Sequence, residues 1–241
     1  MTKARAVRVL FYLLGLLTLA FGLTLNTKTG FGVSPIVSVA YTVSSIWELN
    51  FGNVMLAEYV VFAALEIVLH ILMWRQNRMS VSRFRSILIM DLLQLPLTLL
   101  FTRFMNLFST VLPDLTADCS FLGSVAGRLL ALLTAVVCTG VGAVLILDMR
   151  LIANPGDGIV QVLADFFNAE VGLTKNCFDA GNLLVSISLG LFLSGRLTGV
   201  GLGTAVSMVC VGRVMALFNR FFLEKLHQAA GMALPALETP V

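Results

Sequence analysis

Four polar residues in apolar surroundings could take part in proton chemistry. Glu66 and His70 are four positions apart, so they share one face of a helix. Asp91 and Gln94 are three positions apart and do the same on the next apolar segment. The two segments should form an antiparallel hairpin, which predicts His70 and Asp91 at one depth and Glu66 and Gln94 at the next. We call these four residues the polar cluster. A charged carboxylate at the bilayer centre costs about 2.5–3.5 kcal/mol, so the cluster should face protein or water. Two interpretations are open: a hydrogen-bonded structural cluster, or a proton relay coupled to transport.

Small and polar residues gather at two Gly/Pro-rich breaks, GFGVSP at 30–35 and ANPGDG at 153–158. Such stretches interrupt helices, and Ser34 and Asp157 are residue types that cap the start of a new helix. In one interpretation they only cap. In the other, Ser34 and Asp157 face each other, Asp157 binds a cation or a proton, and the glycines let the backbone approach a polar solute. The candidate solute-binding residues are Gly30, Gly32, Ser34, Asn154, Gly156 and Asp157.

The elements that carry these residues are apolar segments of two lengths. Six long segments cover about 8–26, 53–74, 86–109, 123–148, 174–194 and 200–222. Each can cross a hydrocarbon core of ~30 Å at about 1.5 Å per residue. Two short segments, at 36–47 and 159–169, follow the breaks. They reach only about 18 Å, which is half a bilayer.

The composition also places the chain in a membrane. Hydrophobic residues make up 58% and charged residues 12% of the 241 residues, and the mean hydropathy is +0.95. A soluble domain carries about 25% charged residues, so this chain has too few charges to cover a water-facing surface. The lipid bilayer is therefore the expected surrounding.

The order of segments is the same in both halves of the chain, which predicts an internal duplication. One constant offset pairs Ile36 with Ile159 and Asn53 with Asn176. If both short segments turn back within the membrane, most basic residues gather on one side, as the positive-inside rule requires. If both cross, the basic run at 75–85 changes sides and this asymmetry is lost. The first arrangement gives halves of opposite orientation, with both termini in the cytoplasm.

We therefore expect an all-α fold: a polytopic transmembrane helix bundle of two inverted three-span repeats, each with a broken or re-entrant short helix. Repeat one covers about 8–109 and repeat two about 123–222, within a single transmembrane domain at 1–225. Residues 226–241 should form a mobile cytoplasmic tail. Free N–H groups where a half-helix begins favour an anion or a polar solute group. In the alternative, the breaks are packing devices whose ends bond to neighbouring spans.

Several functional classes have no support in the sequence. The motifs H-E-x-x-H, G-x-S-x-G and the P-loop do not occur, so we expect no enzymatic activity. The four cysteines form no C-x-x-C pair, so neither a metal site nor a cofactor is expected. The basic residues lie at segment ends rather than in a patch, which argues against nucleic acid as a partner. A homo-oligomer or a partner membrane protein is left open.

A third glycine-rich stretch, GVGLGT at 199–204, precedes the last long segment. Its glycines allow close helix packing; alternatively, the stretch is a loop that supports one of the short helices.

Three stretches resemble the YczE/YitT-like family of bacterial membrane proteins. They are FYLLGLLTLAFGLTLNTKTGFGVSPI in the first half, PGDGIVQVL in the second, and GVGLGT before the last span. The likeness covers about residues 8–222 and is closer to the YczE-like branch, because the soluble C-terminal domain typical of YitT relatives is missing. The sequence departs from the family at Asn154, where a glycine usually precedes the proline. The resemblance implies an integral protein of the bacterial plasma membrane and no defined activity.

These features lead to two functional hypotheses. The first is a secondary transporter or exporter of a small polar solute, with the solute at the two breaks and protons at the polar cluster. The second is a non-transporting membrane scaffold or accessory protein of another complex, in which the breaks serve packing alone.

Overall fold

The chain folds into long and short helices that match the long and short apolar segments predicted from the sequence. The computed structural model describes residues 3–232, and no strand occurs within them. The helices are α1 (Lys3–Lys28), α2 (Ser38–Ile46), α3 (Phe51–Arg75), α4 (Val81–Val111), α5 (Val125–Asp148), α6 (Pro155–Phe167), α7 (Val171–Leu189) and α8 (Leu202–Ala229). Single turns lie at Pro35–Val37 and Phe121–Gly123, and a π-helical turn at Gly190–Ser194 follows α7. Six helices are long and apolar enough to cross a membrane, which confirms the predicted spans and the all-α fold.

Polar residues explain where three of the long helices begin. The side chains of Asn50, Ser80 and Ser124 each accept a hydrogen bond from a backbone N–H in the first turn of α3, α4 and α5. Such a cap stabilises a helix by about 1 kcal/mol, because the first-turn N–H groups have no partner within the helix.

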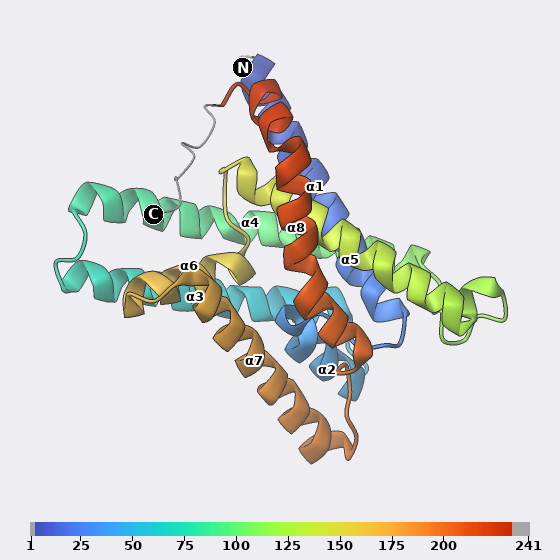
Figure 1. Cartoon of the computed structure of the whole chain (residues 1–241). Helices are drawn as coiled ribbons and strands as arrows, with labels where there is room; N and C mark the ends of the chain where they lie inside the picture. The colour runs from blue at the N-terminus through green and yellow to red at the C-terminus, as the bar shows by residue number, and fades with distance from the viewer. Residues whose placement is uncertain (1–2, 233–241) are drawn as a thin grey trace.

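α1 and α5 pack along each other at the centre of the bundle (Figure 1). Gly15, Gly22 and Gly142 lie at this contact and let the two backbones approach closely, as small residues do between membrane helices. A Cβ atom on Gly22 would lie only 2.6 Å from the backbone nitrogen of Thr139. Larger residues at these positions would push the helices apart.

Two arginines connect the ends of α1 and α5. Near the start of α1, Nε of Arg8 donates to the carbonyl of Met149, just past the end of α5, at 2.6 Å. Near the start of α5, Nε of Arg128 donates to the carbonyl of Thr29, just past the end of α1, at 2.7 Å. The two helices therefore run antiparallel. Inverted repeats require this of the first span of each half, but the duplication itself stays a prediction.

The two short helices lie between the halves of the chain. α2 and α6 each pack against both α3 and α7, so each contacts one long helix of its own half and one of the other half. The end of α6 is held by Arg78 of the α3–α4 loop, which donates to the carbonyls of Asp165 and Phe166, both at 2.8 Å. A cation is favourable here because helix ends carry partial negative charge.

The stretch GVGLGT supports the first break directly. The N–H of Val33 donates to the carbonyl of Gly199 at 2.8 Å, and the N–H of Gly203 donates to the carbonyl of Phe31 at 2.7 Å. Gly32 has a φ of +101°, and a Cβ there would lie 2.6 Å from the backbone nitrogen of Gly201. Backbone packs against backbone here. Both expectations for GVGLGT therefore agree with this contact: its glycines allow close packing, and the stretch supports the segment before a short helix.

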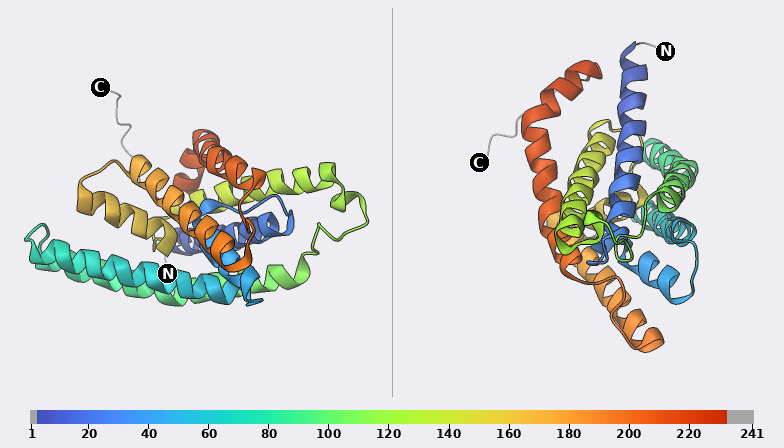
Figure 2. Two further views of the ribbon diagram at one scale, coloured as in Figure 1. Left: turned by 90° about the horizontal axis from the view of Figure 1, so that it is seen from below. Right: turned by 90° about the vertical axis from the view of Figure 1, so that its right-hand side faces the viewer.

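The hairpins of long helices differ between the halves. α3 and α4 pack side by side, whereas α7 and α8 diverge from the loop that joins them (Figures 1 and 2). α8 continues to Ala229, past the predicted start of the tail at 226, and the side chain of His227 is buried. The rest of the predicted tail, 233–241, lies outside the described residues.

The loop between α4 and α5 has a local anchor in Asp114. Its Oδ1 accepts hydrogen bonds from the hydroxyl of Thr116 at 2.7 Å and from the backbone N–H of Thr116 at 2.9 Å. The hydroxyl bond above all, helped by the charges of Lys28 and Arg128, lowers the pKa of the Asp114 carboxyl. This loop packs on the end of α1, since the N–H of Leu115 donates to the carbonyl of Lys28 at 3.2 Å.

Candidate functional site

The polar cluster lies between α3 and α4 as two hydrogen-bonded pairs. Nδ1 of His70 lies 2.7 Å from Oδ2 of Asp91. One turn away, Nε2 of Gln94 donates to Oε2 of Glu66 at 2.9 Å. All four side chains are buried. The pairing expected from the residue spacing is therefore observed, while the role of the cluster in proton coupling stays a prediction.

Glu66 also contacts the second half of the chain. A Cβ atom on Gly158, in the first turn of α6, would lie 2.7 Å from both carboxylate oxygens of Glu66. Glycine at this position thus makes room for the carboxylate beside the start of α6.

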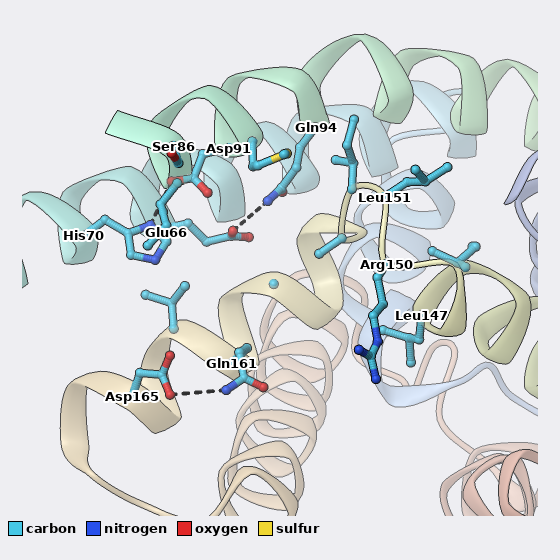
Figure 3. Close-up of a pocket in the computed structure, with 17 residues that line it drawn as sticks. Glu66, His70, Ser86, Asp91, Gln94, Leu147, Arg150, Leu151, Gln161 and Asp165 are labelled. Atoms are coloured by element: carbon cyan, nitrogen blue, oxygen red, sulfur yellow. Dashed lines mark hydrogen bonds and ion pairs between the residues drawn. The ribbon is translucent and has the colours of Figure 1, made fainter. Parts of the chain in front are cut away.

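The cluster forms one wall of a cavity of about 400 Å³, which we call the polar cavity (Figure 3). The opposite wall is α6, with Gly158, Gln161 and Asp165, and Nε2 of Gln161 donates to Oδ1 of Asp165 at 3.2 Å. The segment between α5 and α6, including Arg150, closes one side. The cavity therefore combines residues of both halves.

A second cavity, of about 280 Å³, lies at the first break and is called here the glycine cavity. It is lined by Gly30, Gly32, Tyr41 and the loop that precedes α8. This cavity lies where α1 ends, whereas the polar cavity lies where α5 ends. Because α1 and α5 are antiparallel, the two cavities lie at opposite ends of the central pair.

A third cavity, of about 290 Å³, extends the polar cavity toward the α3–α4 loop. The two share His70, Ile87 and Asp165, and the third cavity adds Arg78 and Arg83 of that loop. The third cavity thus adjoins the polar cavity on the side that the sequence predicts to be cytoplasmic.

The six candidate solute-binding residues do not line one common cavity. Gly30 and Gly32 line the glycine cavity, while Asn154, Gly156 and Asp157 line none of the three. Nδ2 of Asn154 donates to the hydroxyl of Tyr59 at 3.3 Å. Asp157 lies in the first turn of α6, close enough to Lys175 for their charges to interact.

Apolar contacts fill the space where the two breaks approach each other. A Cβ on Gly156 would lie 3.2 Å from Ile36 and 3.2 Å from the hydroxyl of Tyr59. Val37 and Ile159, one on each side, are almost completely buried in the same core. Ser34 precedes the helical turn Pro35–Val37, but its side chain makes no capping hydrogen bond there. We call this region the apolar layer.

Comparison with known proteins gives a family but no activity. Residues 6–220 match the sequence pattern of a family of unknown function, DUF6198. The chain belongs to this family. No curated protein and no solved structure matches this DUF6198 member.

Sequence reasoning missed part of the site of this DUF6198 protein. Gln161 and Asp165 lie on the same face of α6 as Gly158, and their spacing of four was a readable signal. On α7, Asp179, Asn182 and Ser186 are polar residues spaced like one helical face. The hydroxyl of Ser186 lies 2.7 Å from that of Thr42 on α2, so part of this face contacts the other short helix.

Metal binding finds no geometric support in the part of the chain that the structure describes. Within residues 3–232, no three His, Cys, Asp or Glu side chains gather closely enough to hold a metal ion. The polar cavity instead offers hydrogen-bonding groups and titratable side chains, an arrangement suited to binding a small polar molecule or a proton.

Proposed function

We propose that this DUF6198 protein is a secondary transporter or exporter of a small polar solute, coupled to protons, in the bacterial plasma membrane. The observations that carry the proposal are the pair of cavities at opposite ends of the α1–α5 pair and the filled apolar contact where the two breaks meet. In this proposal the apolar layer separates the two cavities. A transporter needs a binding site that is open to one side and closed to the other, and broken helices at the membrane midplane are a recurring way to build it.

The polar cavity is the solute site in this proposal, which moves the site from the two breaks to the space between α3, α4 and α6. The breaks then provide the closed apolar layer, and the polar cluster carries the proton. Buried acids within a membrane typically mark proton or ion pathways. The same proposal includes three further points: both termini lie in the cytoplasm, the two halves are inverted repeats, and the protein belongs to the YczE-like branch.

Reconstitution into proteoliposomes tests the proposal. A panel of radiolabelled small solutes is followed in both directions across an imposed pH gradient. We expect flux of at least one solute that the gradient drives, and its loss in Glu66→Gln. The matched control is Asp118→Asn, which changes a partly exposed carboxyl of the α4–α5 loop and should leave flux unchanged.

Absence of flux for every solute, with the wild type equal to empty liposomes, would exclude transport. Flux that Asp118→Asn reduces as much as Glu66→Gln would exclude the proposed site.

The second candidate, a membrane scaffold or accessory protein, is favoured by one observation. The two breaks meet in filled apolar contact at Ile36 and Gly156 rather than around a cavity. A scaffold predicts that affinity purification from native membranes recovers a second membrane protein in fixed ratio. Recovery of this chain alone would count against it.

A further inference from the structure

We propose that the polar cavity binds a small organic cation, whose N–H groups donate to Oε1 of Glu66 and Oε1 of Gln94. The inference names the substrate class of the proposed transporter and so rests on that function. Three observations lead to it: two unpaired acceptors, an internal carboxylate at the start of α6, and the charges of the cavity walls.

The first observation is a pair of buried acceptors that lack donors. Among the described residues, Oε1 of Glu66 and Oε1 of Gln94 receive no hydrogen bond, although the two residues are only 1% and 3% exposed. The amide orientation follows from Nε2 of Gln94, which donates to Oε2 of Glu66 and leaves its carbonyl oxygen free. Leaving a buried polar group unpaired costs about 1–3 kcal/mol. A ligand that donates to both atoms would recover this free energy.

The second observation concerns the start of α6. A half-helix that begins inside a membrane protein normally offers its N–H groups to an anion. Here the carboxylate of Glu66 already lies against Gly158 in the first turn, with no room for a Cβ between them. The carboxyl group of Glu66 therefore occupies the place where an anionic solute would reach the helix start.

The third observation is the charge of the cavity walls. Three carboxyl side chains line the cavity, from Glu66, Asp91 and Asp165, and the basic groups are His70 and Arg150. His70 is engaged with Asp91. The side chain of Arg150 extends away from Glu66 and Gln94 (Figure 3). Carboxyl groups therefore outnumber basic groups on the walls, and neither basic side chain is directed at the two free acceptors.

The size and lining of the cavity limit the ligand further. About 400 Å³ is at the small end of the range for small-molecule sites. Ile87, Met90 and Val162 supply apolar surface next to the polar wall. A cationic head with a short apolar chain fits this combination, and n-butylammonium is the simplest probe of it.

Calorimetric titration of the purified full-length protein in detergent at neutral pH tests the inference. The three probes have the same chain length but differ in charge: n-butylammonium, n-butanol and butyrate. We expect n-butylammonium to bind and the other two to bind at least about tenfold more weakly. Glu66→Gln should lower the affinity for n-butylammonium by about tenfold or more.

Glu58→Gln is the matched control, because Glu58 is a carboxyl on the same helix that does not line the cavity. It should leave the affinity within about twofold of wild type. If Glu66→Gln does not fold, Gln94→Leu removes the second acceptor and should weaken n-butylammonium in the same way. Gly158→Ala, which displaces the Glu66 carboxylate, should act in the same direction.

Equal binding of butyrate or butanol, no binding of n-butylammonium, or equal affinity in Glu66→Gln would each overturn the inference. These outcomes differ from failure of the proposed function. If n-butylammonium binds but proteoliposomes carry no solute, the site stands and transport is wrong. If the liposomes carry an anionic or neutral solute and n-butylammonium does not bind, transport stands and the cation is wrong.

Discussion

At the scale of residues, the two polar pairs between α3 and α4 differ in how completely their hydrogen-bonding atoms are paired. This difference indicates which pair serves stability and which is available to a ligand. His70 and Asp91 bind each other, so that pair completes a contact between two spans. Glu66 and Gln94 share one bond and each keep a buried acceptor without a donor, and both residues line the polar cavity. The first pair is therefore expected to stabilise the contact between α3 and α4, whatever its part in proton coupling, while the second pair is the one proposed to bind the ligand.

A double-mutant cycle tests whether the His70–Asp91 pair stabilises the fold. Asp91→Ala and His70→Ala should each lower the free energy of unfolding by about 1.5–3 kcal/mol, because each leaves a buried polar partner unpaired. The double variant should cost less than the two single changes together, with a coupling of about 1–3 kcal/mol. Reversible unfolding in mixed micelles is the measurement. Additivity within about 0.5 kcal/mol would show that the two side chains do not support each other.

At the same scale, the sequence predicted the pairs but not the whole cavity. The pairs lie on antiparallel neighbours joined by a short loop, so residue spacing alone set their depth. Gln161 and Asp165 reach the cavity through the contact between α3 and α6, which are far apart in the chain. The spacing of residues within one helix does not indicate which distant helix packs against that face.

Among the elements, the first break depends on direct backbone contact with the loop before α8. The hydrogen bonds of Val33 and Gly203 join the two segments. The sequence showed that both stretches are rich in glycine, and close packing was one expectation for GVGLGT. It did not show that the two stretches pair with each other, because glycine has no side chain whose chemistry could indicate a partner.

Gly32→Ala tests this contact. The positive φ costs an L-residue about 1–2 kcal/mol, and the Cβ would also press on the backbone of Gly201. We expect the free energy of unfolding to fall by about 2 kcal/mol or more. Gly181→Ala is the control, because a Cβ at that helical position on α7 has no atom within 4 Å. It should raise stability by up to about 1 kcal/mol. Thermal unfolding in detergent measures both variants. Equal changes in stability for Gly32→Ala and Gly181→Ala would contradict the proposed importance of this contact.

The described part of the molecule is a bundle of six long apolar helices, two of which, α1 and α5, form the central antiparallel pair. The six helices followed from hydropathy and length, whereas the packing of α1 on α5 was not predicted. Helix type, the six spans and the positions of both short helices were predictable because apolar runs and Gly/Pro breaks are local signals. The divergence of α7 and α8 was not, since the second hairpin resembles the first in length and composition. Packing against the rest of the bundle decides that geometry.

Cysteine labelling tests the predicted sidedness of the whole bundle. Three single-cysteine proteins are compared in intact cells: native Cys119 alone, Leu49→Cys and Gln76→Cys, each without the other cysteines. A membrane-impermeant maleimide should label the first two from outside and Gln76→Cys only after permeabilisation. Cys119, Leu49 and Gln76 are exposed in the structure, so access depends on the side of the membrane. Labelling of all three from outside would refute the inverted arrangement.

The reciprocal bonds of Arg8 and Arg128 have a consequence for motion. Sliding α1 along α5 would break both bonds together and would force the close glycine contacts apart. The two helices should therefore behave as one rigid frame, and any change that opens the glycine cavity and shuts the polar one has to rotate the other helices about it. If the protein transports as proposed, a disulfide engineered between α1 and α5 should therefore leave the transport rate unchanged.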